Sequence, residues 1–168
     1  MPKKENKTNV MRILDQANIA YRPWAYENRD GKIDGVSVAH KLGQNVDQVF
    51  KTLVTRGADG GYFVFVIPVA KELNLKAAAK SVGEKSVEMI HVSEINKATG
   101  YIRGGCSPIG MKKQYPTVID KSCLSQPAIL VSGGKIGTQV ELAPKDLLDF
   151  IGAKAGDIAE DAPEPPQG

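Results

Sequence analysis

The feature that most limits how this chain can fold is a hairpin pattern near the middle of the sequence. Residues 50–55 and 62–67 are two runs of β-branched and aromatic residues, and the segment Gly57-Ala-Asp-Gly-Gly61 separates them. Runs of this composition favour β-strands, and a short glycine-rich connection between two of them is typical of an antiparallel hairpin. We therefore expect these two runs to be the central strands of a sheet.

Helices and further strands alternate around this hairpin. Thr8 is placed to cap a first helix that stops near Asn18, and Ser93 is placed to cap a later helix that ends at Gly100. Pro23 suits its strand to a sheet edge. The other expected helices cover residues 37–42, 45–49, 74–82 and 145–151. The other expected strands cover residues 21–26, 87–90, 117–119, 128–132 and 137–142.

This order of elements lacks the regular long βαβ repeat of a doubly wound sheet. The sequence therefore predicts a mixed α/β (α+β) fold with a single domain, in which helices surround a central β-sheet that is partly barrel-like. The chain has 168 residues, of which 42% are hydrophobic and 24% are charged, as in one soluble globular domain. No apolar run approaches the roughly 20 residues that a membrane helix needs, so we expect no membrane partner.

The two ends of the chain are polar. The basic start does not lead into the apolar core of a secretion signal, so we expect a cytoplasmic protein. Residues 154–168 hold one lysine against four carboxylates and are rich in proline near the end, so we expect a disordered acidic tail there and a folded domain over residues 1–153.

The charge is concentrated in the body of the chain. The tail carries −3, so the total of +3 leaves +6 on residues 1–153. Such a surplus attracts polyanions in a salt-dependent way, although an ordinary soluble surface can carry it as well. Charge alone therefore permits RNA binding without predicting it.

The familiar catalytic motifs are missing from the sequence. It contains no GxSxG elbow, no phosphate-binding P-loop and no GxGxxG dinucleotide pattern. Cys106 and Cys123 lack CxxC spacing, and with His40 and His91 as the only histidines we expect no metal and no cofactor. Cys106 lies in a glycine loop, where a small residue chosen for close packing is a better explanation than a nucleophile.

A lysine in an otherwise apolar strand is the first candidate for chemistry. Lys51 lies within Val49-Phe50-Lys51-Thr52-Leu53-Val54. If it points to solvent, it is an edge charge without a role. If it points into a cleft, its desolvated ammonium can hold a phosphate or a carbonyl oxygen and stabilise developing negative charge.

A glycine-rich loop is the second candidate. Residues 104–110 hold three glycines and Pro108, and they are followed by Lys112 and Lys113. Glycines let backbone amides approach a ligand, so the loop can act as an anion cradle. It can equally be a tight connection and nothing more.

Three segments taken together resemble the YbaK/EbsC family. They are Val49–Val54, then Thr99-Gly-Tyr-Ile-Arg-Gly-Gly-Cys-Ser-Pro-Ile-Gly-Met-Lys-Lys113, then Val131-Ser-Gly-Gly-Lys-Ile-Gly-Thr-Gln-Val-Glu-Leu142. That family comprises Cys-tRNA(Pro) deacylases, which are relatives of the editing domain of bacterial prolyl-tRNA synthetases. The resemblance implies a YbaK/prolyl-tRNA synthetase-associated domain fold. It also implies hydrolysis of mischarged Cys-tRNA(Pro), with Cys-tRNA(Cys) as a further substrate.

The resemblance also implies where the site lies and what it binds. The essential lysine of the family falls on Lys51, and the substrate's own groups are thought to replace a side-chain nucleophile. The implied partners are the acceptor end of the tRNA and a prolyl-tRNA synthetase. The implied substrate-binding residues are Tyr26, Gly104, Gly105, Cys106, Ser107, Pro108, Ser132, Gly133 and Gln139.

Two departures from the family pattern keep alternatives open. Some relatives have an aspartate at the position of Gln139 and an arginine at that of Ile136, whereas both are uncharged here. The choice of cysteine over another small amino acid is therefore open. One alternative is a sister enzyme that clears alanine from tRNA(Pro), and another is a non-catalytic module that binds tRNA or a synthetase.

Overall fold

The predicted hairpin forms the centre of the largest sheet. The structure is a computed structural model, and it describes residues 7–32 and 34–162. Strand β2 (Phe50–Gly57) runs antiparallel to β3 (Tyr62–Pro68), with Phe50 opposite Pro68 and Arg56 opposite Tyr62. This confirms the hairpin prediction.

The largest sheet is mixed, as expected, and contains five strands in the order β5-β2-β3-β6-β9. The added strands are β5 (Val87–Met89), β6 (Thr117–Asp120) and β9 (Lys154–Gly156). Strand β6 is parallel to β3 and to β9, whereas β2 is antiparallel to β3 and to β5. The sheet does not close into a barrel, which corrects the partly barrel-like shape expected from the sequence.

Two smaller sheets flank the largest one. One has the order β1-β8-β7 and consists of β1 (Arg22–Ala25), β7 (Ile129–Ser132) and β8 (Thr138–Leu142). The other pairs β4 (Lys71–Leu73) with β10 (Ala159–Asp161). A parallel bridge between Val49 and Leu130 joins the first of these sheets to the start of β2. As predicted, the strand with Pro23 lies at a sheet edge.

Short helices surround the sheets, and the predicted cap of the first helix is confirmed. The Thr8 hydroxyl accepts a hydrogen bond from the Met11 amide, and Asn18 adopts a left-handed φ of 57° just after the first helix. The predicted Ser93 cap is wrong, because α4 begins directly after His91 and Ser93 lies inside its first turn. The helices are α1 (Asn9–Gln16), α2 (Gly35–Leu42), α3 (Leu75–Ser81), α4 (Val92–Thr99) and α5 (Pro144–Ile151), with 3-10 turns at Val46–Gln48 and Lys121–Ser125.

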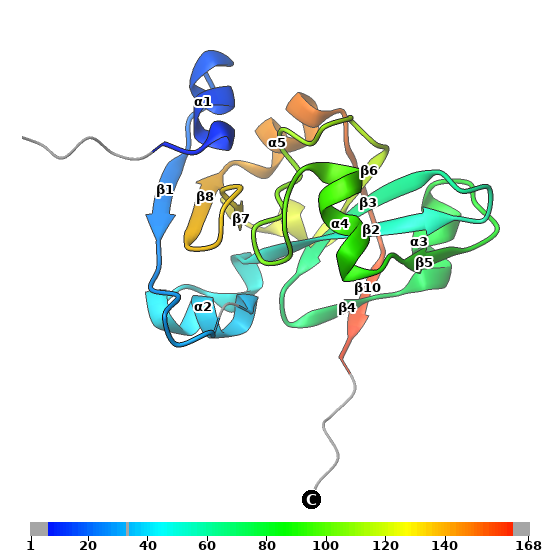
Figure 1. Cartoon of the computed structure of the whole chain (residues 1–168), viewed down its shortest axis with the longest axis horizontal. Helices are drawn as coiled ribbons and strands as arrows, with labels where there is room; N and C mark the ends of the chain where they lie inside the picture. Colours follow the sequence, from blue (N-terminus) through cyan, green and yellow to red (C-terminus); the bar gives the residue numbers. More distant parts are fainter. Residues whose placement is uncertain (1–6, 33, 163–168) are drawn as a thin grey trace, which may run out of the picture.

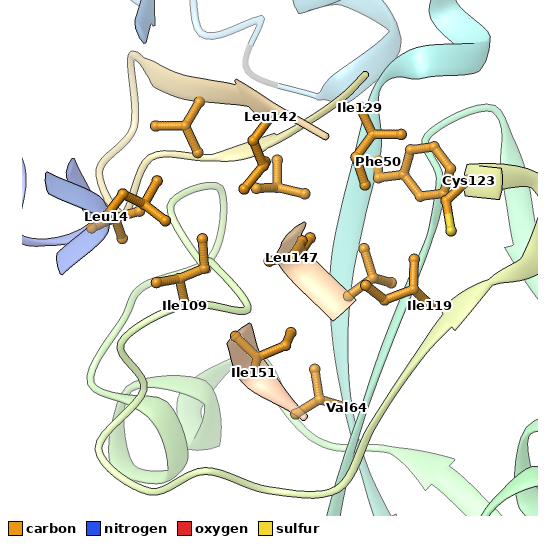
Figure 2. Packing of buried hydrophobic residues seen from close by; sticks show 14 of the residues in the cluster. Leu14, Phe50, Val64, Ile109, Ile119, Cys123, Ile129, Leu142, Leu147 and Ile151 are labelled. Carbon is orange, nitrogen blue, oxygen red and sulfur yellow. The ribbon is translucent and has the colours of Figure 1, made fainter. Parts of the chain in front are cut away.

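Strand β3 separates two hydrophobic clusters. Val64 and Val66 point into the larger cluster, and Phe65 and Ile67 point into a smaller one that includes two alanines of α3. All four side chains are fully buried, which explains why the strand is apolar on both faces. Figure 2 shows the larger cluster, to which α1, α5 and strands of two sheets contribute. In Figure 1, β1, β7 and β8 lie on one side of the molecule, and α3 and β5 lie at the opposite end.

The expected tail boundary at residue 153 is wrong for residues 154–162, because they form β9 and β10. The Asp120 carboxylate accepts the backbone amides of Ile158 and Ala159 at 3.2 and 3.1 Å, and Lys71 forms an ion pair with Asp161. Ile158 is fully buried in the smaller cluster. One apolar anchor and one buried carboxylate therefore hold a segment whose composition is acidic. The rest of the expected tail, residues 163–168, lies outside the described residues.

Candidate active site

An open pocket of about 640 Å³ lies where the three-stranded sheet meets the start of β2. Its walls come from β2, the first turn of α2, the residue that follows β3, the glycine-rich loop, and β7 and β8. This volume is in the usual range for a small-ligand site. Of the residues predicted from the sequence, the pocket brings together Tyr26, Lys51, Gly104, Cys106, Ser132 and Gln139.

Lys51 lies in the wall of this pocket, half-buried, opposite Ile67 in the hairpin register. Burial lowers the pKa of its ammonium group below the ordinary value of 10.5, and attraction to Glu72 only partly opposes this effect. Within residues 7–32 and 34–162 its amine makes no ion pair and donates no side-chain hydrogen bond. A desolvated and unpaired cation in a cleft is suited to hold an anionic or carbonyl oxygen.

The glycine-rich loop enters the pocket through a tight turn. The Gly105 amide donates to the Ile102 carbonyl at 2.9 Å, and Gly104 in the turn has a φ of +87°, which side chains rarely tolerate. A Cβ atom on Gly105 would lie 3.1 Å from the Ile136 nitrogen and 3.2 Å from the Lys135 Cα atom. The loop therefore packs directly on the turn between β7 and β8, with Gly104 and Cys106 on the pocket side.

Four of the predicted substrate-binding residues, Gly105, Ser107, Pro108 and Gly133, lie behind the pocket wall rather than on it. The Ser107 hydroxyl is fully buried and accepts the Ile109 amide at 3.3 Å. A Cβ atom on Gly133 would lie 2.6 Å from the Thr138 hydroxyl. These residues brace the loops that carry the pocket surface.

Cys106 lines the pocket but is poorly suited to attack a substrate. Burial raises the pKa of its thiol to about 11, and a hydrogen bond with Thr99 opposes the shift only in part. A thiol with such a pKa is almost entirely protonated at neutral pH, and the thiolate is the nucleophile. Among the described residues, no group of three or more histidine, cysteine or acidic side chains is arranged to hold a metal ion.

Gln139 is held from outside the pocket by a residue that sequence analysis missed. It is only 6% exposed, and its Oε1 atom accepts a hydrogen bond from Gln44 Nε2 at 2.8 Å. In the part of the chain that the structure describes, no side-chain amide hydrogen bond is donated by Gln139 itself. Its NH₂ group is therefore free to donate to a ligand.

Sequence analysis also missed two charged residues of the pocket wall, Asp34 and Arg103. Asp34 lies three residues before the expected helix 37–42, and Arg103 directly precedes the glycines of the loop. Both residues therefore lie close to segments that the sequence had already indicated. The sequence did not show that the two residues line the same cavity.

Comparison with known proteins gives the family. A family model described as "Aminoacyl-tRNA editing domain" matches residues 34–150. The chain belongs to the aminoacyl-tRNA editing domain family. Editing of an aminoacyl-tRNA is hydrolysis of the ester between amino acid and tRNA, so the chain is an aminoacyl-tRNA deacylase. The family resemblance inferred from its motifs is confirmed.

Individual relatives agree with this membership. A protein of Enterococcus faecalis named "Putative Cys-tRNA(Pro)/Cys-tRNA(Cys) deacylase EbsC" is 44% identical over 93% of this chain and 95% of its own length. The structure of the hypothetical protein APE2540 has a TM-score of 0.83 and 25% identity, over 91% of this chain and 100% of that one. The fold is also shared by a structure described as "a putative trans-editing enzyme for prolyl tRNA synthetase", with a TM-score of 0.75 at 24% identity, over 90% and 96% of the two chains.

The described helices are all too short or too polar to cross a lipid bilayer.

Proposed function

We propose that this protein is a trans-editing enzyme that hydrolyses mischarged Cys-tRNA(Pro) and accepts Cys-tRNA(Cys) as a second substrate. The observation that carries the proposal is an unpaired, half-buried lysine in a pocket whose described walls offer no competent nucleophile or histidine base. The name of the Enterococcus faecalis relative, which covers nearly the whole chain, supports the choice of substrates. Such a protein works in the cytoplasm, where tRNAs are charged.

The pocket favours a mechanism in which the substrate supplies the nucleophile. The cysteine sulfur bonds to its own carbonyl carbon, the ester C–O bond breaks, and the ribose oxygen takes up the proton that the thiol gives up. Water then opens the cyclic thioester and releases cysteine. The protein contributes position, because holding the sulfur close to the carbonyl makes the step intramolecular.

Lys51 is the catalytic residue in this proposal. Its ammonium group stabilises the negative charge that develops on the carbonyl oxygen as sulfur attacks. Gln139, Ser132 and the backbone of Gly104 line the same cavity and bind the aminoacyl group and the terminal adenosine. Tyr26 also lines the cavity, and the backbone amide of Tyr26 donates a hydrogen bond to the Gly137 carbonyl at 3.0 Å.

A deacylation assay with several amino acids tests the proposal. The purified protein is mixed with tRNA(Pro) carrying Cys, Ser, Ala or Pro, and with Cys-tRNA(Cys). We expect multiple turnovers with both cysteine esters, and far slower hydrolysis of the serine ester, which is nearly the same size but lacks a thiol. Fast hydrolysis of Ala-tRNA(Pro) would instead identify an alanine-clearing enzyme, because alanine cannot supply a nucleophile.

The assay also separates catalysis from binding alone. A non-catalytic module would bind tRNA in a salt-sensitive way without releasing amino acid. The body charge of the chain fits such binding, so filter binding at several salt concentrations is measured in parallel. Prolyl-tRNA synthetase is added in a further set, because a synthetase partner would direct a single-domain editor to tRNA(Pro).

A further inference from the structure

The pocket wall carries charges of both signs in separate elements. Lys51 on β2 and Arg103 in the glycine-rich loop are cationic, and Asp34 at the start of α2 is the one carboxylate among the described lining residues. An aminoacyl ester of tRNA carries the same two kinds of charge. Its phosphates and carbonyl oxygen are negative or become so, and its α-amino group is positive.

Asp34 is held firmly at the edge of the pocket. It caps α2, and its two carboxylate oxygens accept the Ser37 amide at 3.1 Å and the Ser37 hydroxyl at 2.7 Å. The next residue, Gly35, packs closely against Val69 of the pocket wall. A Cβ atom on Gly35 would lie 2.1 Å from Val69 Cγ1. The exposed carboxylate is therefore held toward Ser37 by two hydrogen bonds, and the backbone beside it packs on Val69 of the pocket wall.

The Asp34 carboxylate is also ionised and without a cationic partner. The hydrogen bonds from Ser37 hold its pKa below the usual value, with a smaller contribution from the charge of Lys41. The amine of Lys41 pairs with Asp30, at 2.7 Å, and no ion pair to Asp34 is formed within residues 7–32 and 34–162. Each carboxylate oxygen can accept a further hydrogen bond.

We infer that Asp34 binds the α-ammonium group of the aminoacyl ester and so restricts the enzyme to substrates with a free amino group. This inference rests on the proposed deacylase function and adds to it a substrate class, because peptidyl and N-acylated aminoacyl esters lack the cation. With the ammonium at Asp34, the N-cap of α2, the ester carbonyl is directed to the part of the pocket that carries Lys51.

The test compares wild type and Asp34→Asn on two substrates, Cys-tRNA(Pro) and its N-acetylated form. Asp34→Asn removes the charge but keeps the cap, because asparagine caps helices as well as aspartate does. We expect kcat/KM for Cys-tRNA(Pro) to fall about three-fold to ten-fold in the variant, the range for one charged contact near a protein surface. For N-acetyl-Cys-tRNA(Pro) we expect wild type and variant to react equally, and wild type to prefer the free amine.

A matched control is Asp59→Asn in the β2–β3 turn, outside the pocket, which should leave both substrates unaffected. Equal rates of Asp34→Asn and wild type on the free-amine substrate would overturn the inference and leave the deacylase function standing. An equal loss on both substrates would also overturn it. A wild-type protein that hydrolyses none of these esters overturns the proposed function, and the inference with it. If Asp34→Asn does not fold, the wild-type protein still tests the inference. Equal wild-type rates on the free-amine and N-acetyl substrates would overturn it.

Discussion

Gln44 and Gln139 are joined by a side-chain hydrogen bond of 2.8 Å, although 95 positions separate them in the chain. Gln44 follows α2 and Gln139 lies on β8, so the bond ties the helical wall of the pocket to the three-stranded sheet. Because the bond uses the oxygen of the Gln139 amide, it turns the NH₂ group of that amide into a donor for the pocket.

Replacing Gln44 tests this positioning role. In Gln44→Leu the Gln139 oxygen loses its donor, but the buried and unpartnered Gln44 Oε1 atom disappears too, so we expect a change of less than about 1 kcal/mol in unfolding free energy. We expect kcat/KM for deacylation to fall about ten-fold because KM rises, since Gln139 is no longer oriented. Urea unfolding and steady-state kinetics measure the two effects, and Gln114→Leu on the surface is the control. If Gln44→Leu lowered the unfolding free energy but left KM unchanged, the role of Gln44 would be structural only.

Removing the Lys51 amine tests the catalytic role proposed for it. We expect Lys51→Met to lower kcat about 100-fold or more, because a preorganised charge at the oxyanion is lost. Folding should survive, since a half-buried ammonium without an ion pair gives little stability. Circular dichroism and deacylation kinetics are the measurements, with the exposed Lys85→Met as control. Near-normal turnover of Lys51→Met would contradict the proposed mechanism.

The pH dependence of stability tests the burial of the same amine. The lowered pKa of Lys51 means that the unfolded chain binds more protons than the folded one between the folded pKa and 10.5. The cost of burying the charge is therefore fully present below that window and disappears as the pH rises through it. We expect the stability of wild type to approach that of Lys51→Met as the pH rises toward 10.5 in urea titrations. A constant difference between the two proteins would show that the lysine is fully solvated.

The raised pKa of the Cys106 thiol gives a prediction about reactivity. With a pKa of about 11, Cys106 should react with iodoacetamide at pH 7.5 far more slowly than free cysteine does. We also expect Cys106→Ala to keep deacylation within the same order of magnitude, because in the proposed mechanism the substrate thiol is the nucleophile. Mass spectrometry of the labelled protein and the deacylation assay provide the data. An inactive but folded Cys106→Ala protein would restore the enzyme thiol as nucleophile.

Close packing of the glycine-rich loop gives a prediction about stability. In Gly105→Ala the new methyl group meets the backbone of Lys135 and Ile136 at 3.1 to 3.3 Å, and backbone cannot move aside as a side chain can. We expect a loss of about 1–3 kcal/mol in unfolding free energy and slower deacylation. Gly61→Ala, where the new methyl group meets Asp59 at 3.4 Å, is the matched control. Equal melting temperatures for the two variants would show that the loops separate easily.

Local patterns in the sequence predicted most of the fold. The hairpin at residues 50–67, the Thr8 cap and the edge strand with Pro23 depend on neighbouring residues, so their composition indicates them. Strands β4, β9 and β10 were missed because each has three residues and none of those residues is β-branched or aromatic, whereas the equally short β5 begins with a valine. Their pairing is set by contacts between distant segments, such as Leu73 opposite Ala159.

The site was predictable to a similar degree. The motifs indicated Lys51 and the loop around Gly104, but they did not tell which loop residues face the cavity and which support it from behind. That distinction depends on how the loop packs against the turn after β7, which brings Gly105 next to Lys135. Asp34 was missed for the same reason, since its place in the wall depends on how α2 rests on Val69.

The bridge between Val49 and Leu130 has a consequence for how the substrate range of such an enzyme can change. Lys51 lies on β2 and Gln139 lies on β8, so the two pocket residues belong to separate sheets, and the bridge joins these sheets. A slight rotation about the seam would alter the gap between them while every ladder on either side stayed intact. Repacking of interior methyl groups far from the bound ester can therefore retune which amino acid fits, without touching any residue that meets it.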